Sequence, residues 1–282
     1  MNTPAEVAAA GQLACLLEVS APKPGNVSPN RHFHDTRYED FLASAVAIGP
    51  ALLDAGNHPV GAIVRRAVED TRRWTKSNTN LGIVLLLAPL AKAALLSGGT
   101  LRQRLSRVLA DTTLLDAEEV YAAIRRAHPG GLGEAAAEDV SNPPSVSLRD
   151  AMGLAADRDA IAREYVTDFA LTFDVGVPAL RAALDDGLSW GDASVDAYLR
   201  LLDATPDTHI GRKLGAREAE AISVRAREVL KAGGTRTPAG RTALAELDAE
   251  LRDSRNRRNP GATADVTCAA IFVVILEGGW SR

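Results

Sequence analysis

The chain has 282 residues, of which 46% are hydrophobic and 24% charged, and its formal net charge is −4. This is the composition of a globular protein with enough sequence for a large core. The negative net charge argues against non-specific binding to nucleic acid, so we expect no nucleic-acid partner.

The ends and the apolar runs of the chain bear on its location. Residues 1–6 lack the basic start and the long apolar core of a signal peptide. The longest apolar runs, 83–90 and 268–276, are shorter than the roughly 20 residues that a membrane-spanning helix needs. We therefore expect a cytoplasmic protein without a membrane partner. Cys15 and Cys268 lie in apolar surroundings without metal-ligand spacing, and we expect buried, reduced thiols.

Helical spacing of apolar residues runs through most of the chain. The first helix is predicted over 4–19 and ends before Pro22 and Pro24, because proline lacks an amide hydrogen and restricts the residue before it. The other helices predicted for the first half cover 38–55, 60–74, 83–96, 101–110 and 116–127.

A long irregular segment at 128–147 separates the two predicted helical halves. In the second half, helices are predicted over 159–185, with an interruption near 175–178, and over 192–204, 215–231, 241–252 and 262–277. The last of these could also be a strand, although its length favours a helix. The fold class is all-α: a single domain, 1–282, formed by a compact bundle of about a dozen helices.

Polar residues cluster where the predicted helices begin or end, and the site is expected on these helix-connecting loops. The run 76–82 contains Asn78, Thr79 and Asn80 and opens onto a very apolar helix. Such a run can cap the helix, or it can bind an anion or a ribose. Further clusters lie at 22–26, 32–35, 206–213 and 259–265, whereas the standard nucleotide-binding and hydrolase fingerprints are absent from the sequence.

These clusters occur in the order found in the triphosphoribosyl-dephospho-CoA synthase family, which the chain resembles over about residues 10–277. The matching motifs are Pro22-Lys23-Pro24-Gly25-Asn26-Val27, His34-Asp35, Asn78-Thr79 before Gly82, Asp207-Thr208, and Asn259-Pro260-Gly261 with Ala264-Asp265. Gly133-Glu134-Ala135 resembles a further family segment.

The resemblance implies a glycosyl transfer in which the 2′-hydroxyl of dephospho-CoA attacks C1′ of the ATP ribose. Adenine leaves and the triphosphate is retained. Such a reaction needs a carboxylate as base, a proton donor for the departing adenine and a cationic clamp on the phosphates. It also implies Mg²⁺, held by carboxylates beside the phosphates of the substrate ATP.

The resemblance also assigns roles to residues, although each has an ordinary alternative as a helix cap or surface group. The catalytic candidates are Asp35, Asp207 and His209, with His34 as another possible proton donor, and the Mg²⁺ ligands are Asp35 and Asp265. The substrate-binding candidates are Lys23, Asn26, Asn78, Thr79, Asn80, Glu134, Arg212, Lys213 and Asn259.

The chain departs from the family pattern at Asn80 and Leu81, where relatives commonly have His and Lys. Losing charge at a phosphate site is not conservative, so this pattern predicts a divergent branch. Three alternatives follow: another phosphoribosyl or pterin substrate in one-carbon cofactor (tetrahydromethanopterin) biosynthesis, an N-ribosyl hydrolase, or a non-catalytic nucleotide-binding helical protein. The apolar helices could also bury a homodimer face.

Overall fold

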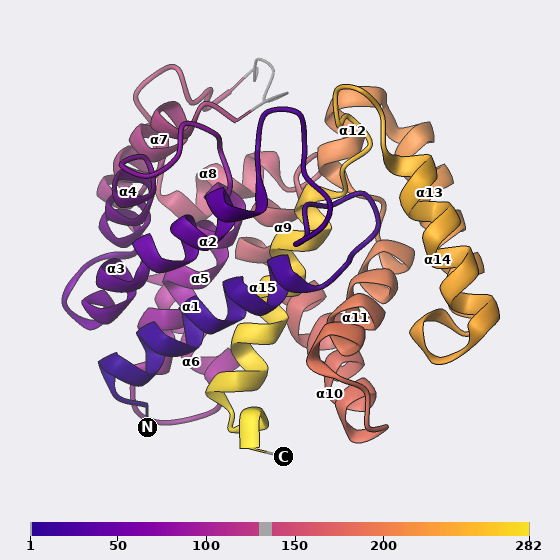
Figure 1. Ribbon diagram of the computed structural model, residues 1–282. Helices are drawn as coiled ribbons and strands as arrows, with labels where there is room; N and C mark the ends of the chain where they lie inside the picture. Colours follow the sequence, from indigo (N-terminus) through magenta and orange to yellow (C-terminus); the bar gives the residue numbers. More distant parts are fainter. Residues whose placement is uncertain (1, 130–136, 282) are drawn as a thin grey trace.

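The computed structural model describes residues 2–129 and 137–281 (Figure 1). The helices of the first half are α1 (Pro4–Ser20), α2 (Tyr38–Ala47), α3 (Gly49–Leu53), α4 (Val60–Thr71), α5 (Leu81–Ala94), α6 (Leu101–Ala110) and α7 (Leu114–Ala127). Those of the second half are α8 (Leu148–Ala155), α9 (Ala160–Val166), α10 (Val177–Asp185), α11 (Trp190–Ala204), α12 (Thr208–Leu214), α13 (Ala216–Lys231), α14 (Pro238–Leu251) and α15 (Gly261–Leu276). Within these residues the backbone has no β-strand beyond one isolated bridge, which confirms the all-α prediction.

The core is built around two helices that are apolar on every side, α15 and α5. A helix without a polar face has to be covered all round by other elements. In Figure 1, α15 runs through the middle of the molecule, and it contacts α1, α5, α10 and α11. The strand alternative for the last element is therefore wrong, because α15 satisfies its own backbone hydrogen bonds where no sheet partner exists.

A second apolar cluster lies at one side of the bundle. It joins α11, α12, α13 and α14 through buried residues such as Leu199, Ile222 and Leu247. Since α11 also contributes Ala193, Ala197 and Leu201 to the main core, it connects the two clusters.

Several predicted boundaries are corrected by backbone geometry. The predicted helix 38–55 is divided into α2 and α3, with Pro50 in the first turn of α3. The predicted break in 159–185 comes earlier, at Asp168 and Phe169, whose φ angles of 51° and 58° end α9 before a π-helical turn at Leu171–Gly176. The short helices α8 and α12 were not predicted, because eight and seven residues give too little periodicity.

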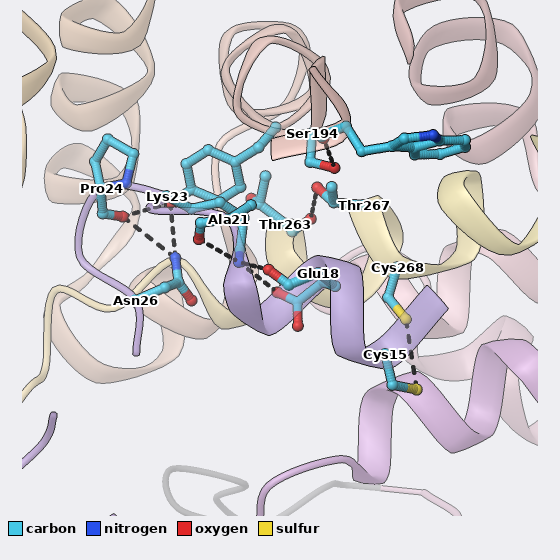
Figure 2. A network of polar contacts seen from close by, with 12 residues as sticks. Cys15, Glu18, Ala21, Lys23, Pro24, Asn26, Ser194, Thr263, Thr267 and Cys268 are labelled. Atoms are coloured by element: carbon cyan, nitrogen blue, oxygen red, sulfur yellow. Dashed lines mark hydrogen bonds and ion pairs between the residues drawn. The ribbon is translucent and has the colours of Figure 1, made fainter. Parts of the chain in front are cut away.

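The two cysteines are confirmed as buried free thiols. Cys15 of α1 and Cys268 of α15 lie with their sulfur atoms 3.8 Å apart, where the two helices cross (Figure 2). None of the helices that the structure describes is both long and apolar enough to cross a membrane.

We predict that Gly61→Ala destabilises the protein by about 1–3 kcal/mol, the usual cost of overpacking. A Cβ at Gly61 would lie 2.5 Å from the backbone oxygen of Asp116, where α4 packs on α7. The free energy of unfolding in urea measures the effect. Gly153→Ala is the matched control, since a Cβ there meets only Val166 at an ordinary 3.6 Å. Equal stability of the two variants would contradict the packing described for α4 and α7.

Candidate active site

A cavity of about 280 Å³ opens where α1, α5, α7, α8, α9, α12 and α15 meet. One wall is apolar and is formed mainly by Leu85, Ile124, Leu148, Met152 and Ile161. The polar wall is formed by the polar lining residues Glu18, Asn26, Asn78, Thr79, Asn80, Asp159, His209, Arg212, Asn259 and Asp265. The cavity therefore brings together eight of the residues that the sequence proposed, from four different loops or helix ends.

Asp265 projects from α15 into the polar wall. No hydrogen-bond donor among the described residues reaches its carboxylate. Burial raises the pKa of Asp265 well above its usual value, and the nearby acids Glu18, Asp207 and Asp159 add to this effect. Gly82 gives the carboxylate its space, since a Cβ at Gly82 would lie 2.0 Å from Asp265 Oδ2. A carboxylate without a donor beside other acids is suited to holding a cation or a proton.

Glu18 lies near the end of α1 and also lines the cavity, although the sequence did not single it out. Its carboxylate Oε1 is 2.9 Å from the ammonium of Lys23, which also donates to the backbone oxygens of Glu18 and Ala21 (Figure 2). Lys23 is 1% exposed and does not line the cavity. The expectation that Lys23 clamps a phosphate is therefore wrong for this conformation, because its charge is already paired with Glu18.

The turn that carries Lys23 is fixed from behind. The amide of Asn26 donates to the carbonyl of Pro24 at 3.2 Å and to the hydroxyl of Tyr198 at 3.0 Å. Gly25, with φ of 74°, donates its backbone N–H to Asp248 at 2.9 Å. Asn26 thus lies at the cavity wall as predicted, but its amide hydrogens hold the turn together.

Asp207 has a structural place that differs from the catalytic one predicted. It caps α12 by accepting from the amide of Ile210 at 3.0 Å, and it accepts from the amide and hydroxyl of Thr263, both at 2.8 Å. It is 2% exposed and does not line the cavity. Asp207 therefore fixes α12 against the start of α15 rather than facing a substrate.

His209 does line the cavity, packed against Gly261, where a Cβ would lie 2.3 Å from its Nδ1. Burial, together with the positive charges of Lys213 and Arg212, lowers the pKa of His209 to about 3. The imidazole is therefore neutral at pH 7, so the predicted donation of a proton by His209 to the departing base would have to come from the neutral ring. A neutral ring can still donate or accept one hydrogen bond.

Arg212 and Lys213 differ in their access to the cavity. Arg212 lines it and forms an ion pair with Asp159, while its Nε is buried without a partner. Lys213 is half-buried outside the lining, and burial lowers its pKa, with Arg212 adding to the effect. Asn259 also lines the cavity, and its Oδ1 is buried without a partner. A buried unpaired polar atom is costly, which suits Arg212 and Asn259 to meeting a ligand.

The polar run before α5 combines capping with cavity lining. Asn78 Oδ1 accepts from the amide of Leu81 at 3.2 Å, and Thr79 shares a hydrogen bond of 2.6 Å with Ser44. Asn80 instead donates to Thr71 at 3.0 Å, so its side chain does not cap α5. The capping interpretation of this run is therefore confirmed for Asn78, whereas binding of an anion or a ribose stays a prediction.

Two predicted residues fall outside the site. The side chain of Asp35 is 61% exposed, lies beside His34 and does not line the cavity, so the predicted Asp35–Asp265 metal pair is not formed. Glu134 lies outside the residues that the structure describes. In the described part of the chain, no three His, Cys, Asp or Glu side chains form a preformed metal site.

Sequence reasoning missed the other carboxylates of the cavity, which are Glu18, Glu138, Asp139 and Asp159. Glu18 is an acid near the end of the largely apolar helix α1, and Asp159 accepts from the amide of Ala162 at 3.0 Å as the N-cap of α9. In a sequence, both signals are indistinguishable from ordinary surface or capping acids.

Comparisons with known proteins identify the family of this chain. The family model described as ATP:dephospho-CoA triphosphoribosyl transferase matches residues 4–282. A Klebsiella pneumoniae 2-(5''-triphosphoribosyl)-3'-dephosphocoenzyme-A synthase is 29% identical over 94% of this chain and 92% of its own length. A Pseudomonas fluorescens protein named a probable synthase of the same kind is 32% identical, but the match spans only 38% of that protein and 39% of this chain.

A solved structure supports the same assignment. A crystal structure from Archaeoglobus fulgidus, with a provisional triphosphoribosyl-dephospho-CoA synthase name, has a TM-score of 0.66 and 29% identity. It covers 84% of this chain and 99% of its own. This chain belongs to the ATP:dephospho-CoA triphosphoribosyl transferase family.

We predict that Asp265→Asn abolishes activity yet makes the protein more stable at pH 8 than the wild type. A folded-state pKa above the unfolded value means that stability is lost as the pH rises towards the folded pKa. The amide does not ionise, so the stability difference should grow from about pH 4 upwards. Thermal unfolding at several pH values, in buffer with a chelator, measures this difference. A pH-independent difference would contradict the buried environment of Asp265.

Asp35→Asn is the matched control, because its exposed side chain lies outside the cavity. We expect near-wild-type activity and a stability difference that varies little with pH. Loss of activity in this variant would restore Asp35 to the site.

Proposed function

We propose that this family member transfers the triphosphoribosyl group of ATP to the 2′-hydroxyl of 3′-dephospho-CoA and releases adenine. The observation that carries the proposal is Asp265, a carboxylate without a protein donor, in a cavity that also contains the unpaired Nε of Arg212. A glycosyl transfer needs both carboxylates near the reacting carbon and positive charge near the phosphates.

The cavity has separate regions for the parts of ATP. The apolar wall of α5, α7, α8 and α9 provides a surface on which a planar base can be buried. The polar wall contains the carboxylates beside which C1′ of the ribose would lie. Arg212 and Asn259, each with an unpaired polar atom, suit the phosphate and hydroxyl groups. The neutral His209 can hydrogen-bond to the sugar or to the departing base.

The charges in the cavity support a role for Mg²⁺. The described lining contains five carboxylates (Glu18, Glu138, Asp139, Asp159 and Asp265) and two guanidinium groups (Arg158 and Arg212). A triphosphate would be repelled by this excess of negative charge unless cations accompany it. Mg²⁺ is commonly held by one or two carboxylates together with substrate phosphates, so Asp265 fits as the protein ligand. When bound, the ion would neutralise phosphate charge.

The defining experiment combines the protein with ATP, 3′-dephospho-CoA and MgCl₂ and follows adenine by chromatography and the product by mass spectrometry. We expect adenine only when the acceptor is present. Adenine release without the acceptor would identify a hydrolase. Thermal stabilisation by ATP without turnover would identify a nucleotide-binding protein.

We predict that a chelator stops the reaction and that added Mg²⁺ restores it. ATP should also stabilise the protein against heat far more in Mg²⁺ than in a chelator, because the acidic lining repels the free nucleotide. Equal stabilisation in both buffers would contradict the proposed cation.

We predict that Arg212→Gln raises the KM for ATP and lowers kcat/KM by about 10- to 100-fold, since it removes one of the two guanidinium groups that line the cavity. Arg200→Gln is the matched control, because Arg200 forms an i,i+4 pair with Asp196 on α11 and does not line the cavity. An unchanged KM for ATP in Arg212→Gln would remove Arg212 from the phosphate site.

A further inference from the structure

We propose that Glu18 is the catalytic base of this transfer and that Lys23 is its positioning residue, an inference that rests on the proposed function. Glu18 ends the polar wall at the helix α1, and Lys23 lies directly behind it, away from the cavity. In this pair the carboxylate of Glu18 can meet a substrate in the cavity, whereas the ammonium of Lys23 cannot reach it.

The contacts of Glu18 leave one side of its carboxylate open. Oε1 is 2.9 Å from the Lys23 ammonium. No other hydrogen-bond donor in the described chain reaches either carboxylate oxygen, so Oε2 is available to a hydroxyl in the cavity. The residue is 4% exposed, which keeps bulk water from competing for that position.

Lys23 is held so that it can serve only Glu18. Its ammonium also donates to the backbone oxygens of Glu18 and Ala21, and its turn is fixed by the contacts of Gly25 and Asn26 described above (Figure 2). A buried ion pair contributes little net stability, because desolvation of the two charges offsets their attraction. The pair is therefore better explained by the orientation of Glu18 than by the stability of the fold.

The other acids near the polar wall are already engaged. Asp207 is saturated by Ile210 and Thr263, and Asp159 caps α9 and pairs with Arg212. Asp265 is the ligand proposed for the cation. Glu18 is the remaining buried acid of this wall with a free oxygen and a fixed orientation.

The acceptor oxygen forms a bond to C1′ while its proton passes to Glu18 Oε2. The C1′–N bond breaks, its electron pair leaves on the adenine nitrogen, and that nitrogen takes up one proton from water. Glu18 then returns its proton to solvent, so no proton is gained or lost overall. No oxidant or reductant is involved, and Lys23 keeps its proton throughout.

The first test is Glu18→Gln, for which we expect kcat to fall at least 100-fold, as for the loss of a general base, with ATP affinity unchanged within threefold. Because this change leaves the Lys23 ammonium buried without a partner, the double variant Glu18→Gln/Lys23→Met keeps the test valid if the single variant fails to fold. A double variant with kcat within threefold of the wild type would overturn the proposal.

Lys23→Met separates positioning from phosphate binding. A positioning residue lowers kcat and leaves the dissociation constant of ATP unchanged, whereas a phosphate clamp weakens ATP binding. Weakened ATP binding with unchanged kcat would overturn the proposed role of Lys23. Asp196→Asn is the matched control, since Asp196 is another buried acid, paired with Arg200 and Arg236, outside the cavity. It should keep its activity per folded molecule.

Chemical rescue supplies a readout that a purely structural role would not change. Glu18→Ala leaves space beside the Lys23 ammonium, and added formate should restore kcat at least tenfold in this variant but not in Glu18→Gln. Lost kcat without rescue by formate would overturn the base assignment. A wild-type protein that releases no adenine from ATP and dephospho-CoA would overturn the proposed function instead.

Discussion

Three hydrogen bonds to the carboxylate of Asp207 determine how the candidate site is assembled. They join the first turn of α12 to the first turn of α15, two segments that are separated by more than fifty positions in the chain. Through α12 they place His209 and Arg212, and through α15 they place Asp265. Since all three bonds are shielded from water, their loss would leave a buried charge and two unpaired amides, which is far costlier than losing a surface cap.

The site also places acids where the fold does not favour them. Asp265 lies at the wall of the cavity with no hydrogen-bond donor, close to Glu18 and Asp159, and its pKa is raised by this environment. An arrangement that costs stability and lies in a cavity is typical of a functional site. The same negative charge explains why a cation should accompany an anionic substrate. The pair between Arg212 and Asp159 leaves Nε of Arg212 without a partner.

The Pro22–Asn26 turn illustrates how one motif can have a different use from the one its composition indicates. Two prolines and a lysine in a loop resemble an exposed anion clamp. In the folded chain the side chain of Lys23 turns back to the end of α1, where Glu18 is its partner (Figure 2). The positive φ of Gly25 and the contact with Tyr198 complete the turn, and both depend on α11 and α14, which come much later in the sequence.

The sequence by itself determined the helical class, the apolar helices α5 and α15, the free cysteines and the clusters at helix ends, because periodicity and capping chemistry are local. The order of the family motifs singled out further residues, and four of them, Asn78, Arg212, Asn259 and Asp265, line one cavity. Only the tertiary structure decided which of these residues are free to act. Asp207 is bound by Thr263, which is distant in the chain, and Lys23 is paired with Glu18 behind the polar wall. Asp35 lies outside the cavity, whereas Glu18 and Asp159 line it. Burial and pairing are properties of the packed helices, and no local pattern of residues specifies them.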